Sequence, residues 1–203
     1  MKDQNVSLER AITIYRAHKG VLKTSEAIRA GIHPRTIYMM RDMGILEVLS
    51  RGIFRLADLP PLGAPDLVKV MLKVPKGVLC LISALAHHDM TTQIPHVVYV
   101  AIDRRTRQPK ISYPPTRMFR IAPSQLEAGV EKYTVDNHEI RVYSPERTVV
   151  DCFKYRNKIG QDVALEALRL YKERGPMKLS LILKYAKMCR VENVMRPYLE
   201  SAI

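Results

Sequence analysis

The stretch KTSEAIRAGIHPRTIYMMRDMGIL, residues 23–46, has two short helical patterns separated by one glycine and one isoleucine. Thr24 can cap the first helix, and Gly31 can adopt the left-handed conformation that a sharp turn requires. His33 and Pro34 are typical of the cap and the first residue of a second helix, because proline has no amide hydrogen and is tolerated at that position. The pattern predicts a helix-turn-helix.

The apolar spacing predicts which side of the second helix is exposed. Ala27, Ile37 and Met40 have the separations that pack the second helix onto the first. In helix-turn-helix proteins the opposite side of the second helix enters the major groove of DNA. We therefore expect base-edge contacts from His33, Arg35, Thr36 and Tyr38, with Met39 and Arg41 exposed beside them. Phosphate contacts are expected at the start of the first helix, from Lys23, Thr24 and Ser25.

The next segment, ILEVLSRGIFRL (residues 45–56), predicts a two-stranded hairpin with a basic tip. Leu46 and Val48 alternate with a glutamate, and a Ser-Arg-Gly turn precedes the second strand. A hairpin in this position is the wing of a winged helix. Arg51 and Arg55 are expected to contact phosphate, which positions a protein on DNA without reading its sequence.

A proline-rich segment divides the chain. Residues 59–65, LPPLGAP, cannot continue a helix or a paired strand, so we predict a linker there. Residues 1–58 would form the winged helix-turn-helix domain, and residues 66–203 a mixed α/β (α+β) domain. In the second domain we expect strands at 96–102, 118–121, 131–135 and 139–143, and helices at 66–73, 77–90, 145–156, 162–173, 179–189 and 194–201.

The composition favours a polyanionic partner. The 203 residues carry a formal net charge of +13, with a pI of about 9.8. Such an excess favours nucleic acid, and the alternative is a basic protein that its charge keeps soluble. The sequence has no apolar run of membrane-spanning length and no signal-like start, so we expect a cytoplasmic protein. The three cysteines form no CxxC pair and predict neither disulfides nor a zinc site.

Two clusters of polar residues contain side chains that are found in metal or catalytic sites. His87-His88-Asp89 could bind a metal or transfer protons, but neighbouring residues on a helix point about 100° apart. Asp136 and Glu139 distantly resemble the carboxylates of metal-dependent nucleases and are better explained by a polar hairpin turn. No phosphate-binding glycine loop or nucleophile motif is present. We therefore expect no catalytic residue, no metal site and no cofactor.

Residues 103–120, DRRTRQPKISYPPTRMFR, hold six basic side chains against one acidic side chain. Three prolines make this segment irregular and exposed. It either extends the DNA footprint or docks an acidic or RNA-binding partner, and the alternative is a solvated loop. The candidate contacts are Arg104, Arg105, Arg107, Lys110 and Arg117.

The chain resembles the AbiEi-type antitoxins, which are transcriptional regulators of bacterial and archaeal abortive-infection toxin–antitoxin systems. The resemblance is carried by GIHPRTIYMMRDMGILEVLSRGIFRL (31–56), LCLISALAHHDMTTQIPHVVYVAI (79–102) and VYSPERTVVDCFKYR (142–156). Its more specific parts are the Ser-Pro-Glu-Arg-Thr-x-x-Asp string, residues 144–151, and the Ala84-Leu85…Ile94-Pro95 stretch. We interpret the string as structural, with Ser144 capping a helix and with Arg147 and Asp151 spaced to pair.

The resemblance implies two roles. The N-terminal domain would bind inverted or direct repeats in its own promoter and repress the operon. The C-terminal domain would counteract a cognate nucleotidyltransferase toxin of the AbiEii type, in some members without a stable complex, as part of phage defence. Two alternatives remain: an orphan winged-helix regulator without a toxin, and a metal-dependent nuclease with a DNA-binding arm.

Overall fold

The computed structural model describes residues 2–200. Residue 1 and residues 201–203, which include the ends of both predicted domains and of the helix predicted over 194–201, lie outside the described residues. The chain divides into two compact units. The N-terminal unit comprises residues 1–65 and 136–138, and the C-terminal unit comprises residues 66–135 and 139–203.

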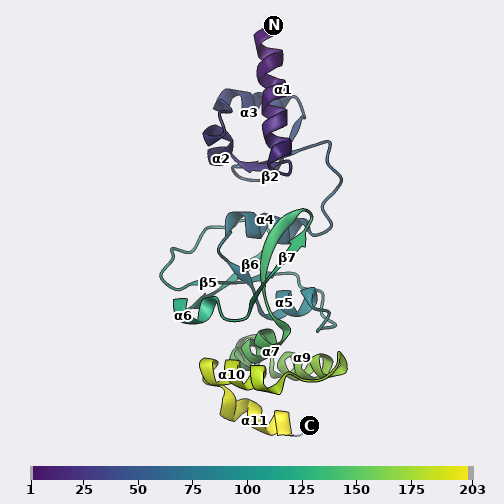
Figure 1. The fold of residues 1–203 in the computed structure, drawn as a ribbon, viewed down its shortest axis with the longest axis vertical. Helices are drawn as coiled ribbons and strands as arrows, with labels where there is room; N and C mark the ends of the chain where they lie inside the picture. Colours follow the sequence, from purple (N-terminus) through teal and green to yellow (C-terminus); the bar gives the residue numbers. More distant parts are fainter. Residues whose placement is uncertain (1, 201–203) are drawn as a thin grey trace. The chain divides into compact units, whose positions relative to one another are not determined.

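The N-terminal unit is a winged helix (Figure 1). Its three strands form an antiparallel sheet in the order β1-β3-β2, and the β2–β3 hairpin is the wing. Ala27, Ile37 and Met40 are all buried in the core of this unit, as the spacing predicts. The elements are α1 (Lys2–Ala17), β1 (Val21–Lys23), α2 (Thr24–Arg29), α3 (Pro34–Asp42), β2 (Leu46–Ser50) and β3 (Ile53–Leu56).

The turn between α2 and α3 is built by Gly31. Its φ of 91° lies in the left-handed region, where a side chain would be strained. The amide of Gly31 donates to the carbonyl of Ile28, and the amide of Ile32 donates to the carbonyl of Ala27 at 3.0 Å. This pair of bonds is a Schellman motif, which satisfies the last carbonyls of α2. The predicted sharp turn is confirmed.

The C-terminal unit is a five-stranded mixed sheet with helices on both faces, in the strand order β6-β5-β4-β8-β7. Its β5–β6 and β4–β8 pairs are parallel, and its β4–β5 pair is antiparallel. The strands are β4 (Val78–Leu79), β5 (Val98–Asp103), β6 (Thr116–Ile121), β7 (Val130–Val135) and β8 (His138–Tyr143). The helices are α4 (Pro65–Lys73), α5 (Leu81–His87), α6 (Pro123–Leu126), α7 (Pro145–Lys154), α8 (Arg156–Ile159), α9 (Gln161–Glu173), α10 (Leu179–Cys189) and α11 (Glu192–Glu200).

Alternate residues of the central strands enter two separate cores. Val78 and Ala101 belong to the core on the side of α5, α7, α9 and α10, whereas Leu79 and Val100 belong to the core on the side of α4. The mixed α/β fold class predicted from the sequence is confirmed. The single helix predicted over 77–90 is wrong at its start, because a strand that is buried on both faces is as uniformly apolar as a buried helix.

Candidate nucleic-acid interface

The first turn of α3 is fixed by its own sequence. The His33 side chain caps the helix, with its Nδ1 accepting the amide hydrogen of Arg35 at 3.2 Å, and Pro34 is the first helical residue. These predicted roles are confirmed. Because the imidazole Nδ1 is already used as an acceptor, the exposed His33 offers its other ring nitrogen to a ligand.

One side of α3 faces outward. Arg35 is exposed, and Tyr38, one turn further on, is 45% exposed. The Tyr38 ring meets the ring of Phe54 on β3 edge to face, with centroids 6.2 Å apart, so the outward side of α3 adjoins the wing. The Arg41 guanidinium lies 5.1 Å from the Tyr38 ring centre. Arginine and tyrosine are thus combined on one exposed surface.

Two residues of α3, Thr36 and Met39, differ from expectation. Thr36 is only 8% exposed, so the prediction that it contacts a base edge is wrong: it lies one turn before Met40, on the inward stripe of α3. Met39 is half-buried. Arg41 is exposed, as predicted, and it donates to its neighbour Asp42 at 2.6 and 2.8 Å, so a DNA contact would have to replace that pair.

The start of α2 lies beside the turn of the wing. The Thr24 amide donates to the Gly52 carbonyl at 2.9 Å, and the Thr24 hydroxyl donates to the same oxygen at 3.3 Å. The predicted role of Thr24 as the helix cap is therefore wrong, and Lys23 occupies that position. The Lys23 amide donates to the Glu26 carboxylate at 3.0 Å.

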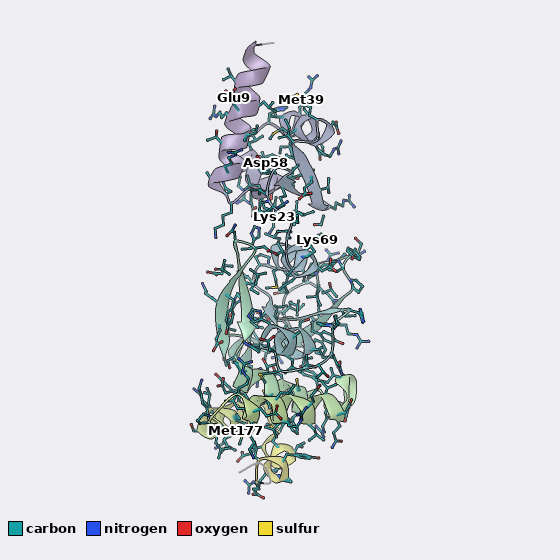
Figure 2. All side chains as sticks on the ribbon, turned by 90° about the vertical axis from the view of Figure 1, so that its right-hand side faces the viewer. Glu9, Lys23, Met39, Asp58, Lys69 and Met177 are labelled. Carbon is teal, nitrogen blue, oxygen red and sulfur yellow. The ribbon has the colours of Figure 1, made fainter. Side chains whose placement is uncertain are left out.

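The backbone amides of Lys23 and Thr24, which were expected to be free to bind phosphate, are thus already used within the protein. Ser25 and Arg51 are exposed. Figure 2 shows that Lys23 and Met39 lie well apart within the N-terminal unit.

Arg55 is not available for phosphate. Its side chain is only 6% exposed, and its guanidinium donates to the Glu47 carboxylate at 2.5 Å and to the Pro60 carbonyl. The prediction of a phosphate contact there is wrong, because Arg55 instead ties β3 to β2 and to the segment that follows the wing.

An exposed apolar residue of the wing was missed by the sequence reasoning. Leu46 is buried, but Val48 is 53% exposed, and Val48 pairs with Phe54, the contact of Tyr38. The β2–β3 pairing is regular from Leu46 to Val48 and shifts register only between Val48 and Ser50, so Val48 lies on the same face of β2 as Leu46 but outside the core of the unit.

The basic segment of the C-terminal unit is exposed, as expected. It joins β5 to β6, and all five of its candidate residues are exposed: Arg104, Arg105, Arg107, Lys110 and Arg117. Arg105 pairs with Asp103 at 3.1 Å. Arg120 donates to the carbonyl of Arg104, which anchors the start of the loop to β6.

The carboxylates considered for a nuclease have other partners. The Asp136 carboxylate accepts the amide hydrogens of Gly63 and Ala64 at 2.9 Å each, and these two bonds lower its pKa. Glu139 pairs with Lys132 at 3.0 Å. Among the described side chains, those of residues 6–200, no group of three or more His, Cys, Asp or Glu is placed to hold a metal ion.

His87 and His88 lie at the C-terminal end of α5. This helix ends at His87, so the two rings leave helical spacing and their centroids lie 5.2 Å apart. His88 is buried and its Nε2 lies 2.7 Å from the Tyr143 carbonyl; because a carbonyl only accepts, Nε2 carries the hydrogen. Burial lowers the pKa of both imidazoles, which are therefore neutral in the fold.

We expect the stability of the C-terminal unit to fall as the pH falls from about 7 to about 5. The unfolded chain takes up protons near the ordinary histidine pKa of 6.5, whereas the folded chain takes them up only at lower pH. This difference in proton uptake lowers the free energy of unfolding below the ordinary histidine pKa, and it has no effect well above that pKa. Urea unfolding at several pH values measures this. His88→Gln should reduce the pH dependence and His96→Gln, at an exposed position, should not. Equal pH dependence in the wild type and His88→Gln would contradict the assignment.

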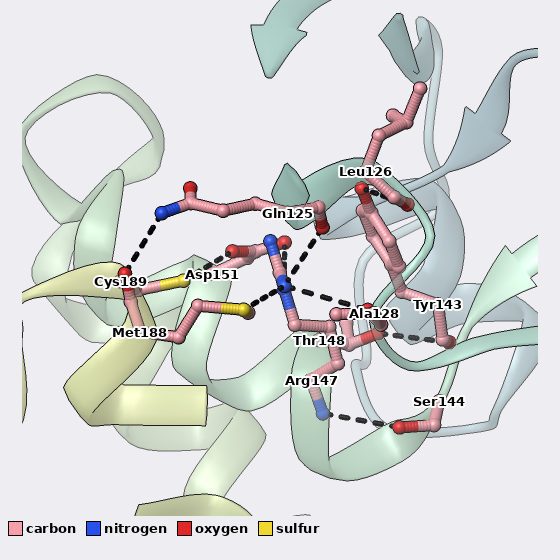
Figure 3. A network of polar contacts seen from close by, with 10 residues as sticks. All are labelled: Gln125, Leu126, Ala128, Tyr143, Ser144, Arg147, Thr148, Asp151, Met188 and Cys189. Carbon is pink, nitrogen blue, oxygen red and sulfur yellow. Dashed lines mark hydrogen bonds and ion pairs between the residues drawn. The ribbon is translucent and has the colours of Figure 1, made fainter. Parts of the chain in front are cut away.

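The Ser-Pro-Glu-Arg-Thr-x-x-Asp string forms the buried start of α7 (Figure 3). The Ser144 hydroxyl caps the helix by accepting the amide hydrogen of Arg147, and Arg147 donates to Asp151 at 3.1 Å. The guanidinium is fully buried, donates to the carbonyls of Gln125 and Ala128, and lies 4.7 Å from the ring centre of Tyr143. The predicted cap and ion pair are confirmed, and their place is the interior of the unit.

The match to known proteins lies in the N-terminal unit. No helix within residues 2–200 is long and apolar enough to span a membrane. No curated protein sequence matches the chain. The predicted resemblance to the AbiEi regulators is confirmed over residues 9–57, which match the family model described as "Transcriptional regulator, AbiEi antitoxin". These residues are fewer than half of the 203 in the chain.

Proposed function

We propose that the chain is an autorepressor: its winged helix binds operator repeats in its own promoter. The observation that carries the proposal is the exposed arginine and tyrosine side of α3 beside the wing, in a segment that matches the AbiEi regulators. Arg35 and Tyr38 would meet base edges in the major groove, with His33 at the helix start. Ser25 and Arg51 would meet phosphate on either side of that groove.

The C-terminal unit would act as the antitoxin. By the resemblance stated above, it would counteract a nucleotidyltransferase toxin of the AbiEii type in the cytoplasm, with or without a stable complex, and so take part in phage defence. The support is the family description and the residues that carry the resemblance. No residue is proposed to be catalytic, because Asp136 and Glu139 are engaged by other groups.

An orphan regulator is the second candidate, because the family model matches only residues 9–57. The neighbouring gene separates the two. A nucleotidyltransferase gene next to this one, whose toxicity is suppressed by the full chain, supports an antitoxin. An isolated gene whose product still represses its own promoter supports an orphan regulator.

The wing allows a matched pair of tests. Arg51→Ala should weaken binding to all DNA sequences alike and reduce the slope of log affinity against log salt concentration by about one. Arg55→Ala should leave that slope unchanged, because its guanidinium is bonded inside the protein. Fluorescence anisotropy with promoter DNA at several salt concentrations measures both slopes. An unchanged slope in Arg51→Ala would remove the wing from the proposed interface.

A further inference from the structure

An open strand edge lies at one side of the sheet of the C-terminal unit. In the order β6-β5-β4-β8-β7, β6 is an outer strand, and within residues 2–200 it pairs with β5 alone. A strand with one neighbour directs about half of its amide and carbonyl groups away from the sheet. These groups can accept a further strand.

A groove of about 720 Å³ follows this edge. It is lined by five successive residues of β6, Thr116 to Arg120, together with Gln108, Tyr155 and Lys158. Successive side chains of a strand point to opposite faces, so a groove that touches five in a row runs along the edge of the strand rather than over one face. Gln108 comes from the loop between β5 and β6, and Lys158 comes from α8.

The groove is positively charged. Arg117, Arg120 and Lys158 line it, and it has no acidic lining residue, which gives a charge of +3. None of the three forms an ion pair within the described part of the chain. The Lys158 ammonium lies 6.0 Å from the ring centre of Phe119 and 5.7 Å from that of Tyr155, so it already covers the aromatic surface of the groove.

We propose that β6 receives an extended acidic segment of another protein as an additional strand. Backbone hydrogen bonds along the edge would hold the segment, and its carboxylates would meet Arg117, Arg120 and Lys158. Nucleic acid fits less well, because its backbone has no amide groups to pair with a strand edge and the aromatic rings already contact a cation. A second copy of the chain fits less well because pairing two β6 edges would place arginines against arginines. The proposal does not depend on DNA binding by the N-terminal unit.

A labelled peptide of about eight residues, in which pairs of glutamates alternate with pairs of valines so that carboxylates point to both faces of the added strand, tests the proposal by fluorescence anisotropy with the full chain. We expect saturable binding below about 1 mM. Lys158→Glu should weaken it about tenfold, whereas Lys172→Glu, the same charge change at an exposed position of α9, should change it less than about twofold. Methylation of alternate backbone nitrogens of the peptide should also weaken binding about tenfold, because it prevents strand pairing. Circular dichroism checks that both variants fold.

Four outcomes would overturn the proposal. The first is no saturable binding of the glutamate peptide. The second is equal binding of the methylated peptide, which would indicate charge attraction alone. The third is an equal loss in Lys172→Glu. The fourth is binding of labelled oligothymidine that Lys158→Glu abolishes while the glutamate peptide fails to bind, which would make the groove a nucleic-acid site.

Discussion

Arg35→Ala is expected to weaken binding of the full chain to its operator by about 1–3 kcal/mol and to relax sequence preference at one base pair. Arg35 is exposed one residue after the first residue of α3, where a helix in the major groove meets base edges. A guanidinium that bonds a guanine at two points loses both bonds on truncation. The measurement is anisotropy with operator DNA and with single-base variants of it.

Arg16→Ala is the matched control. Arg16 is also exposed in the N-terminal unit, but it belongs to α1 and pairs with Asp58 at 2.9 Å. Its removal takes away the same charge from the same unit without touching α3. Equal losses in Arg16→Ala and Arg35→Ala would indicate a general effect of charge and would contradict base recognition by α3.

Arg147→Met is expected to lower the free energy of unfolding of the C-terminal unit by about 3–5 kcal/mol. The substitution leaves the Asp151 carboxylate buried without its cation, and it removes the donors to the carbonyls of Gln125 and Ala128. Burial raises the pKa of Asp151, and Arg147 is the largest of the influences that oppose this, ahead of Lys154 and Cys189. Losing the guanidinium therefore leaves the buried carboxylate with only weaker partners, among them the Cys189 thiol at 3.6 Å.

The cysteines provide the measurement. Cys80, Cys152 and Cys189 are all buried and all lie in the C-terminal unit, so thiol labelling in urea reports its unfolding separately. Arg169→Met is the control, because Arg169 forms an exposed pair with Glu173 at 2.8 Å, and such pairs contribute less than about 1 kcal/mol. Equal midpoints for the two variants would show that the buried pair does not stabilise the unit.

The parts of the fold that could be predicted from the sequence depend on local signals. The starts of α3 and α7 were predictable because each has a capping side chain followed by proline, and the turn before α3 because glycine permits a positive φ. These signals act within a few residues and do not depend on the rest of the chain.

The wrong predictions concern features that depend on contacts between residues far apart in the sequence. The short strands β1 and β4 exist only through pairing with β3, β5 and β8, which a three-residue or two-residue segment cannot indicate by itself. Arg55 stands between apolar residues, as an exposed residue of a strand does. Its guanidinium is nevertheless buried, because it donates to the Glu47 carboxylate and to the Pro60 carbonyl. The groove beside β6 combines the basic loop with α8, and no sequence pattern joins those segments.

The central claim is that the winged helix reads operator DNA. Footprinting of the full chain on the promoter of its own gene, in parallel with Arg35→Ala, tests it most directly. The account predicts protection of repeated sites that weakens with added salt and is reduced in the variant. Absence of protection at low salt, or protection that Arg35→Ala leaves unchanged at every site, would contradict it.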